Sequence, residues 1–388
     1  MIAYNKTWFD NLQLVKEAKS WLKEKFISPE QYSAIKETYP THFYHPNVII
    51  RILLFIASLI ALGGVTGLLG LMFGGLLDNF FEELAFFYGI ASWVFMEMIF
   101  IKNNKHFKSG VNEALLYHSL GWTIGGFAGM INNLNIILIF ALVLLAFAAI
   151  RYVDLICTAL AIGVFSYLVF YNLYEAGEIT RQIIPFVFIA IFIPVYFVAS
   201  RSRRKFSLVS WNDNLIILEA AALLIIYAAG NYLVVRELSI EMMGIFLEEG
   251  QDIPFAWLFY LLTIAIPIIF LVAGLRKKDI ILLRVSVVAI VFSAFTFKYY
   301  FSLGHPEVTL TLAGAILLTI AMSLFRYLRT PRNGFTRENI IKEKWADANP
   351  QAFIISQTMG GNKLETTGEI NEMGGGGISS GGGSSDRF

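Results

Sequence analysis

The run VIIRILLFIASLIALGGVTGLLGLMF, residues 48–73, decides the class of fold. The hydrocarbon core of a bilayer is about 30 Å thick, and a helix that rises about 1.5 Å per residue crosses it in about 20 residues. This run is long enough to cross, and similar apolar runs recur along the chain. They predict ten transmembrane helices, over residues 48–73, 84–101, 112–130, 135–150, 155–174, 183–200, 214–235, 253–275, 279–298 and 308–326.

The composition excludes the usual interpretation of a 388-residue chain as two or three soluble domains. Apolar residues make up 56% of the chain and charged residues 15%, whereas soluble domains carry about 25% charged residues. The formal net charge of +1 excludes nucleic-acid binding by bulk electrostatics. The lone cysteine, Cys157, excludes an intramolecular disulfide and a cysteine zinc site. The sequence therefore predicts an all-α polytopic transmembrane bundle and indicates no cofactor and no metal site.

The basic residues predict how this bundle is oriented, because Lys and Arg concentrate in cytoplasmic loops. If the N-terminus is cytoplasmic, the predicted outer loops contain only Arg181 and Arg236 as basic residues, together with most of the loop acids. The inner connections that carry the other loop cations are 102–111, 151–154, 201–213 and 276–278. We therefore expect both termini on the cytoplasmic side.

Two cytoplasmic segments are expected to flank the membrane domain, which we assign to residues 47–326. Residues 1–46 are predicted to form a helical hairpin whose second helix starts at Ser28-Pro29-Glu30-Gln31. Ser28 suits the N-cap, Pro29 the first helical position, and Gln31 the return hydrogen bond of a capping box. Residues 327–388 end in a Gly/Ser-rich segment, a composition that favours flexible coil.

The segment Trp21-Leu22-Lys23-Glu24-Lys25-Phe26-Ile27-Ser28-Pro29-Glu30-Gln31, followed by a polytopic region, resembles one family of membrane proteins. This is a bacterial family of predicted polytopic membrane proteins of unknown function, whose members share an N-terminal W…I-S-x-E-Q segment. Many members carry glycine where this chain has Lys25. The resemblance covers about the first fifty residues. It implies a bacterial inner-membrane protein and no particular catalytic or binding residue.

Ionisable side chains within membrane spans are costly and are therefore candidate functional groups. With the predicted orientation, four of them lie about 6–9 Å below the cytoplasmic interface, at about 1.5 Å per residue. These residues are Glu97, His118, Glu219 and Arg284. They predict a polar layer in which Arg284 offsets one glutamate. Glu219, Leu223, Tyr227 and Asn231 recur at four-residue intervals, so Asn231 is expected to share the inward stripe of Glu219.

Glycines at four-residue spacing indicate close helix packing. Gly63 and Gly67 predict such a face on the first span, and Gly121, Gly125 and Gly129 predict one on the third. The glycine-rich first span and the sixth span, with Pro185 and Pro194, are also expected to be interrupted helices. Interrupted helices at equivalent places in the halves 48–174 and 183–326 are typical of inverted-repeat transporters.

Secondary transport of a small solute or ion is the leading functional hypothesis from these features. A purely structural role for the polar layer remains open. The alternative function is a membrane scaffold or sensor that binds a cytoplasmic protein partner through the hairpin and tail. An enzyme is not favoured, because the five histidines form no H-x-x-x-H or H-E-x-x-H pattern. The sequence does not choose a substrate or an oligomeric state; the expected surroundings are the lipid bilayer.

Overall fold

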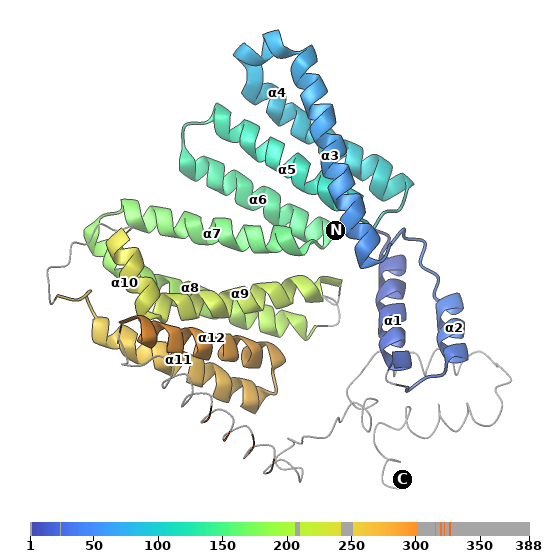
Figure 1. The fold of residues 1–388 in the computed structure, drawn as a ribbon. Helices are drawn as coiled ribbons and strands as arrows, with labels where there is room; N and C mark the ends of the chain where they lie inside the picture. The colour runs from blue at the N-terminus through green and yellow to red at the C-terminus, as the bar shows by residue number, and fades with distance from the viewer. Residues whose placement is uncertain are drawn as a thin grey trace, which may run out of the picture. The chain divides into compact units, whose positions relative to one another are not determined.

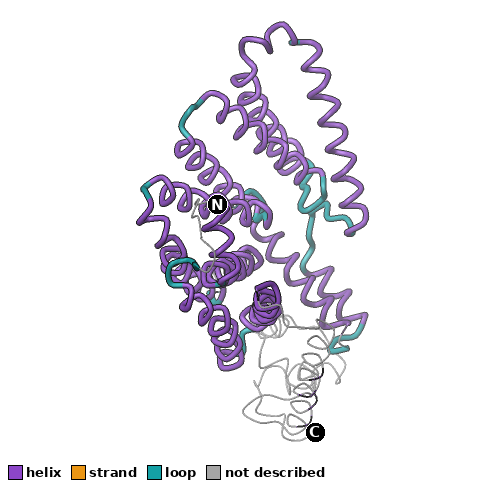
Figure 2. Tube along the Cα trace, turned by 60° about the vertical axis from the view of Figure 1, so that its left-hand side comes forward, coloured by secondary structure: helices purple, strands orange, loops and turns teal. Residues whose placement is uncertain are grey.

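The computed structural model describes residues 2–23, 25–205, 210–241 and 251–300, apart from the side chains of 75–79, together with positions 315, 319, 322 and 326. These residues form helices joined by loops, and no strand occurs among them (Figure 2). The chain divides into two compact units. One unit comprises Met1–Phe9 and Thr41–Ser302, and the other comprises Asp10–Pro40 and Leu303–Phe388.

The first unit is built from apolar helices. They are α3 (Val48–Met72), α4 (Gly74–Phe95) with the π-helix η1 (Met96–Asn103), α5 (Val111–Met130), α6 (Leu134–Tyr152), α7 (Leu155–Glu175), α8 (Glu178–Arg203), α9 (Asn212–Gly230), α10 (Tyr232–Glu241), α11 (Ala256–Lys277) and α12 (Ile280–Tyr300). Eight helices in the described residues are long and apolar enough to cross a membrane. The protein is therefore an integral, multi-pass membrane protein.

Nine of the ten predicted spans coincide with helices in the described part of the chain. The third of them, α5, is the only one of these nine that is not among the eight membrane-spanning candidates. It carries Asn112, Glu113 and His118 together with four glycines, which lower its hydropathy. The tenth predicted span, 308–326, lies outside the continuously described residues, as does the tail 327–388.

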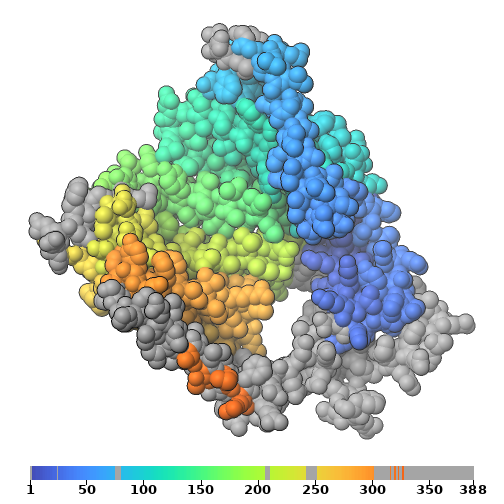
Figure 3. All heavy atoms as spheres, in the orientation of Figure 1, coloured from blue at the N-terminus to red at the C-terminus, as the bar shows by residue number. Residues whose placement is uncertain are grey.

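Consecutive helices pack as antiparallel pairs, because short connections favour antiparallel neighbours. The most extensive pairings are α4 with α5, α8 with α9, α11 with α12, and α6 with α7. Figure 1 shows these helices stacked in broadly the order of the chain. The helix α3 contacts α5 and α4, but none of its residues is buried, and its side chains lie on the surface in Figure 3.

Two contacts join helix ends that the predicted topology places on the same side of the membrane. The side chain of Arg51, in the first turn of α3, contacts Glu113 at the start of α5. Trp211, before α9, donates a hydrogen bond to the carbonyl of Ile150 at the end of α6 (2.9 Å). The predicted alternation of up and down helices accounts for these contacts.

The predicted interruptions of the first and sixth spans are wrong. The helix α3 runs without a break from Val48 to Met72 through its glycines, and α8 runs from Glu178 to Arg203 through Pro185 and Pro194. Glycine lowers helix stability by only about 1 kcal/mol, so the apolar environment keeps such a helix continuous. These two helices therefore give no support to an inverted repeat.

In the described part of the chain, the seventh predicted span, 214–235, is broken. The helix α9 ends at Gly230, Asn231 adopts an extended conformation (φ −83°, ψ 126°), and α10 begins at Tyr232. The side chain of Thr263 accepts the freed backbone N–H of Tyr232 at 2.9 Å. Asn231 Oδ1 accepts from the N–H of Val234 at 3.3 Å, as an N-cap does. These side chains satisfy the backbone groups that a break exposes inside an apolar domain.

The predicted glycine packing faces differ from the observed one. A Cβ added at Gly63, Gly67, Gly121 or Gly125 would meet no atom within 4 Å, and the atoms nearest to one at Gly129 would belong to the Glu82 side chain. The close helix contact instead uses Gly126, where an added Cβ would contact the backbone N of Phe86 and would lie 2.7 Å from the carbonyl oxygen of Glu82. The sequence spacing identified the glycine-rich helix but selected the wrong face of it.

In the second unit, the described residues between Asp10 and Pro40 form a helical hairpin from most of α1 (Lys6–Lys23) and from α2 (Pro29–Thr38). Ala18, Trp21 and Ile35 form its buried core. The predicted capping box is confirmed: Gln31 N–H donates to Ser28 Oγ at 3.2 Å, and Ser28 N–H donates to Gln31 Oε1 at 2.8 Å.

Candidate functional site: acidic residues and their arginine partners

Glu97 lies in η1 and is paired with an arginine from the end of α6. Arg151 Nε donates a hydrogen bond to Glu97 Oε2 at 3.0 Å, and Arg151 Nη2 contacts Oε1. Tyr152 Oη donates to the same Oε2 at 2.8 Å, and Lys102 Nζ lies 3.6 Å from Oε1. The carboxylate is therefore held by a bidentate arginine pair, which is a strong type of ion pair.

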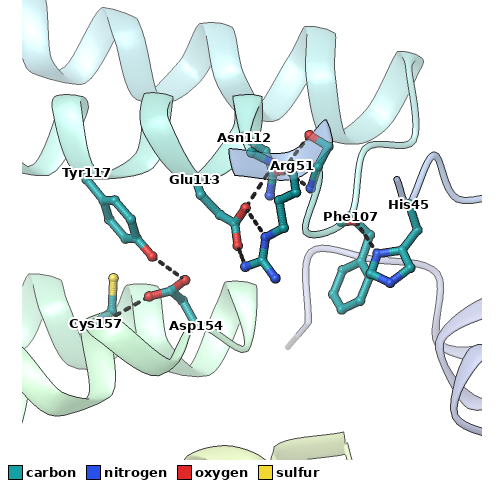
Figure 4. Close-up of polar contacts among 10 residues, drawn as sticks. His45, Arg51, Phe107, Asn112, Glu113, Tyr117, Asp154 and Cys157 are labelled. Carbon is teal, nitrogen blue, oxygen red and sulfur yellow. Dashed lines mark hydrogen bonds and ion pairs between the residues drawn. The ribbon is translucent and has the colours of Figure 1, made fainter. Parts of the chain in front are cut away.

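A second acid–arginine pair joins α3 to α5. Arg51 Nε donates to Glu113 Oε2 at 3.0 Å, and Arg51 Nη2 contacts Glu113 Oε1 (Figure 4). The backbone N–H of Gly110 donates to the same Oε2 at 2.9 Å. Gly110 has a φ of +93°, and a Cβ there would contact the carbonyl oxygen of Arg51, so only glycine fits at this position.

A third acid, Asp154, connects α5 with the start of α7. It accepts a hydrogen bond from Tyr117 Oη at 2.9 Å and, as the N-cap of α7, one from the backbone N–H of Cys157 at 2.8 Å (Figure 4). The amide of Asn214 on α9 donates to the carbonyl of Asp154 at 3.0 Å and to Thr158 Oγ1 at 2.6 Å. Every one of these contacts positions a helix end.

Glu219, on α9, has a different environment. Its side chain is 0% exposed, and neither carboxylate oxygen accepts a hydrogen bond from the residues that the structure describes. Arg203 Nε, at the end of α8, lies 3.3 Å from Glu219 Oε2. The same guanidinium donates from Nη2 to Asp279 Oδ2 at 3.2 Å, and the Asp279 side chain is only 3% exposed. Glu219 and Asp279 thus share one arginine.

The number of charges distinguishes this cluster from the other pairs. Glu97 accepts hydrogen bonds from Arg151 and Tyr152, and Glu113 accepts them from Arg51 and Gly110. At Glu219, two carboxylates contact one guanidinium, so if both are ionised their combined negative charge exceeds the charge of Arg203 by one. A buried carboxylate with no hydrogen bond is strongly unfavourable, so Glu219 is the acid with a structural reason to bind a proton or a cation.

The residues of the predicted polar layer each have different partners in the structure. His118 Nε2 lies 3.1 Å from Tyr88 Oη, and Arg284 is exposed and has no ion pair in the described residues. No hydrogen bond or ion pair links Glu97, His118, Glu219 and Arg284 to one another among the residues described. Arg284 therefore offsets neither glutamate. The arginines in that role are Arg151 and Arg203.

Asn231 shares the buried stripe of Glu219, as the four-residue spacing predicts, because Glu219, Leu223, Tyr227 and Asn231 are all buried. Its amide nitrogen donates to Tyr227 Oη at 2.9 Å and to Thr296 Oγ1 at 3.0 Å. Asn231 Oδ1 accepts the N–H of Val234 at 3.3 Å. The side-chain nitrogen and oxygen of Asn231 therefore both form hydrogen bonds at the break between α9 and α10. This makes Asn231 a structural residue of α9 and α10.

Several residues that matter here were missed by the sequence interpretation. Glu113 falls inside the predicted third span, 112–130, and should have been counted with the intramembrane acids. Arg151 and Arg203 were assigned to inner loops as topology signals, although each ends a helix and reaches back to an acid. An acid within two turns of the end of a span, combined with an arginine at a helix end, is a signal that could have suggested these pairs.

The loop before α5 contains a titratable group outside the membrane spans. Burial lowers the pKa of His106 below its ordinary value of 6.5. His106 pairs with Tyr44 through backbone hydrogen bonds (Tyr44 N to Lys105 O, 3.1 Å; Phe107 N to Tyr44 O, 3.2 Å). The neighbouring ring of His45 contacts the carbonyl of Phe107 through Nδ1 at 3.1 Å (Figure 4).

We expect this loop to weaken in acid. Because the folded-state pKa of His106 lies below its unfolded-state value, the associated stability is fully present above about pH 6.5 and is lost as the pH falls through the folded-state pKa. Amide hydrogen exchange at Phe107, corrected for its intrinsic rate, should therefore accelerate as the pH falls below about 6.5, the ordinary pKa of histidine. In His106→Gln this acceleration should disappear after correction for intrinsic exchange. The same acid dependence in the variant would show that another group is responsible.

In the residues described, no group of three or more His, Cys, Asp or Glu side chains could hold a metal ion. Comparisons of the chain with protein-family models, with curated proteins and with solved structures found no match. The fold and the site therefore define the class of protein: an all-helical multi-pass membrane protein with paired acids and arginines at its helix ends.

Proposed function

We propose that this protein is a proton-coupled secondary transporter of a small solute or ion, and that Glu219 carries the coupling proton. The observation that supports the proposal is the buried Glu219 carboxyl group, which has no hydrogen bond and only a share of Arg203. Protonation removes the excess negative charge of the cluster while the membrane domain is closed. Proton relays built from intramembrane acids are a common basis of transport.

The coupling mechanism follows from the shared guanidinium. With Glu219 protonated, Arg203 and Asp279 form a neutral pair at 3.2 Å. When the cluster opens to water, Glu219 can release its proton, because solvation then stabilises the carboxylate. Closing the cluster again without a proton or another cation would bury an uncompensated charge, at several kcal/mol. This difference between open and closed states is what couples proton binding to the conformational change.

The helix that carries Arg203 is suited to such a movement. Pro185 and Pro194 lie inside α8, and each removes one backbone hydrogen bond and favours bending at that point. Bending at Pro194 moves the last turns of α8, including Arg203, relative to Glu219 on α9. The helices α8 and α9 pack closely along their length, so a small movement of α8 changes the contact with Glu219 directly.

We also propose a location in the cytoplasmic membrane of a bacterium, with both termini in the cytoplasm. The asymmetry of Lys and Arg among the predicted loops supports this orientation. The contacts of Arg51 with Glu113 and of Trp211 with Ile150 join helix ends that this orientation assigns to the cytoplasmic side, and so they support it. The Arg203 cluster belongs to that same end, so Glu219 receives its proton near the cytoplasmic face.

Glu219→Gln tests the proposal in proteoliposomes that contain the full chain and an internal pH dye. A panel of cations, amino acids, sugars and organic anions is added outside, and solute-driven proton movement is recorded. The wild-type protein is expected to move protons with one solute class, and Glu219→Gln to reduce that flux at least 100-fold. Glu175→Gln, an exposed acid at the end of α7, is the matched control and should retain the flux. Equal flux in wild type and Glu219→Gln would refute Glu219 as the coupling residue.

An infrared measurement tests the proton site without knowledge of the solute. At neutral pH the ionised acids of the chain absorb as carboxylates, whereas a protonated Glu219 absorbs as a carboxylic acid. We expect the carboxylic-acid band of the purified protein to disappear in Glu219→Gln and to persist in Glu175→Gln. A wild-type protein with no such band at neutral pH would contradict a proton on Glu219.

A further inference from the structure

A cavity of about 490 Å³ that is largely open to the surface lies beside α5, in the part of the first unit remote from Glu219 in sequence. Its lining includes Phe81, Tyr117, His118, Gly121, Trp122 and Gly125. The volume lies within the range of roughly 300–1,000 Å³ that is usual for ligand sites. We propose that this cavity binds a neutral long-chain alcohol, drawn from the bilayer, with its hydroxyl group at His118 and its chain along the glycines. The proposal does not rest on the proposed transport function.

The glycines form an open floor for an apolar chain. A Cβ added at Gly121 or Gly125 would meet no atom within 4 Å, whereas one at the adjacent Gly126 would contact the backbone of Phe86. The α5 backbone is therefore packed on one side and bare on the other. Gly121 and Gly125 lie four residues apart on one face, so about 6 Å of uncovered helix continues beyond His118 toward the C-terminal end of α5.

Aromatic rings form the walls. The ring of Trp122 lies 6.3 Å from that of Phe81 and 6.2 Å from that of His118, centroid to centroid. Tyr88 approaches Trp122 at 5.7 Å and His118 at 5.5 Å in edge-to-face arrangements. These rings support one another and hold the cavity open beside the glycines. An apolar chain against their faces buries surface on both partners, which is favourable by about 25 cal/mol per Å².

The polar end of the cavity has a defined hydrogen-bond direction. Thr66 Oγ1 donates its one hydrogen to the carbonyl of Leu62 at 2.8 Å, so at its 3.1 Å contact with Tyr88 Oη it must accept. Tyr88 therefore donates its hydrogen to Thr66 and accepts one from His118 Nε2, also at 3.1 Å. A neutral His118 that is protonated on Nε2 has a free lone pair on Nδ1. This atom has no hydrogen-bond partner in the described residues, and it recognises a hydrogen-bond donor.

The depth of His118 restricts the charge of the ligand. His118 is seven residues after Val111, the start of α5, which corresponds to about 10 Å along the helix. A phosphate or carboxylate at that depth would be expensive to desolvate, and it would present an acceptor to the acceptor Nδ1. A hydroxyl group is uncharged and donates a hydrogen bond. A long-chain alcohol, including a glycerol monoester or a polyisoprenoid alcohol, therefore combines the required donor with the apolar chain.

Photolabelling of the full-length protein in lipid nanodiscs tests the proposal. The probe is a C16 alcohol with a diazirine in its chain, incorporated in the bilayer, and its methyl ether is the matched probe without a donor. One hydrogen bond of about 1 kcal/mol corresponds to roughly fivefold in binding, so we expect about fivefold more labelling of α5 by the alcohol than by the ether. In His118→Phe this preference should vanish, because both probes then meet an apolar ring.

Gly121→Leu tests the floor of the cavity. The added side chain enters open space, so the protein should fold, yet labelling of α5 should fall at least tenfold because the chain position is filled. Gly163→Leu on α7 is the matched control, since a Cβ there also meets no atom within 4 Å and the residue lies outside the cavity. Equal labelling by alcohol and ether, stronger labelling by a C16 carboxylate probe, or unchanged labelling in Gly121→Leu would each overturn the proposal.

Discussion

Replacing Arg203 with glutamine is expected to lower the free energy of unfolding by about 3–5 kcal/mol, which is the usual loss when one partner of a buried ion pair is removed. Arg203 is 20% exposed, and it contacts Glu219 and Asp279, whose side chains are 0% and 3% exposed. With Glu219 protonated, the variant leaves the Asp279 carboxylate buried without a cation. The loss can be measured by unfolding of the purified protein in mixed micelles with increasing SDS.

The double variant Arg203→Gln/Asp279→Asn separates the charge effect from a loss of packing. Asparagine at position 279 keeps the hydrogen bond that Asp279 Oδ1 accepts from the backbone N–H of Ile281 (2.9 Å), but it carries no charge. We expect the double variant to recover more than half of the lost stability, a coupling of about 2 kcal/mol or more. Arg201→Gln, an exposed arginine on the same turn, should change stability by less than about 0.5 kcal/mol. An equal loss in Arg201→Gln and Arg203→Gln would contradict a special role for Arg203.

Gly126→Ala is expected to destabilise the protein by about 3 kcal/mol, at the upper end of the usual cost of overpacking. The new methyl group would lie 2.7 Å from the carbonyl oxygen of Glu82 and would contact the backbone N of Phe86. Backbone atoms of α4 cannot rotate away as a side chain can, so α4 and α5 must separate. The same unfolding measurement reports the loss, and cross-linking between α4 and α5 reports the separation.

Gly121→Ala is the control on the same helix, and its effect should have the opposite sign. Its Cβ meets no atom within 4 Å, and alanine is favoured over glycine in a helix by about 0.5–1 kcal/mol. We therefore expect a small gain in stability. Similar losses in Gly121→Ala and Gly126→Ala would show that α5 does not contact α4 through Gly126.

The helices themselves were largely predictable from the sequence. The predicted span 135–150 corresponds to α6 at Leu134–Tyr152, and the span 155–174 corresponds to α7 at Leu155–Glu175. The start of α2 was predicted from Ser28 and Gln31, and both capping hydrogen bonds are present. These features are local. Apolar length and cap chemistry act within one segment and do not depend on the arrangement of the other helices.

The candidate site was only half predictable. The sequence identified Glu97 and Glu219 as unusual because an acid in an apolar run is rare. It predicted that Arg284 offsets one of them, whereas the structure pairs Glu97 with Arg151 and Glu219 with Arg203. The two glutamates belong to different helix groups, and which arginine each one meets depends on how α6 and α8 pack against their neighbours.

The sequence alone determined that this is a helical membrane protein, where its helices lie along the chain, and how the capped hairpin before them begins. Only the tertiary structure decided that Gly126 rather than Gly121 packs against α4, that the helix after Asn212 breaks at Asn231, and that Glu219 shares one arginine with Asp279. The physical reason is that hydropathy is a property of each segment, whereas the face of a helix that becomes buried and the partner of a buried charge are properties of two segments in contact.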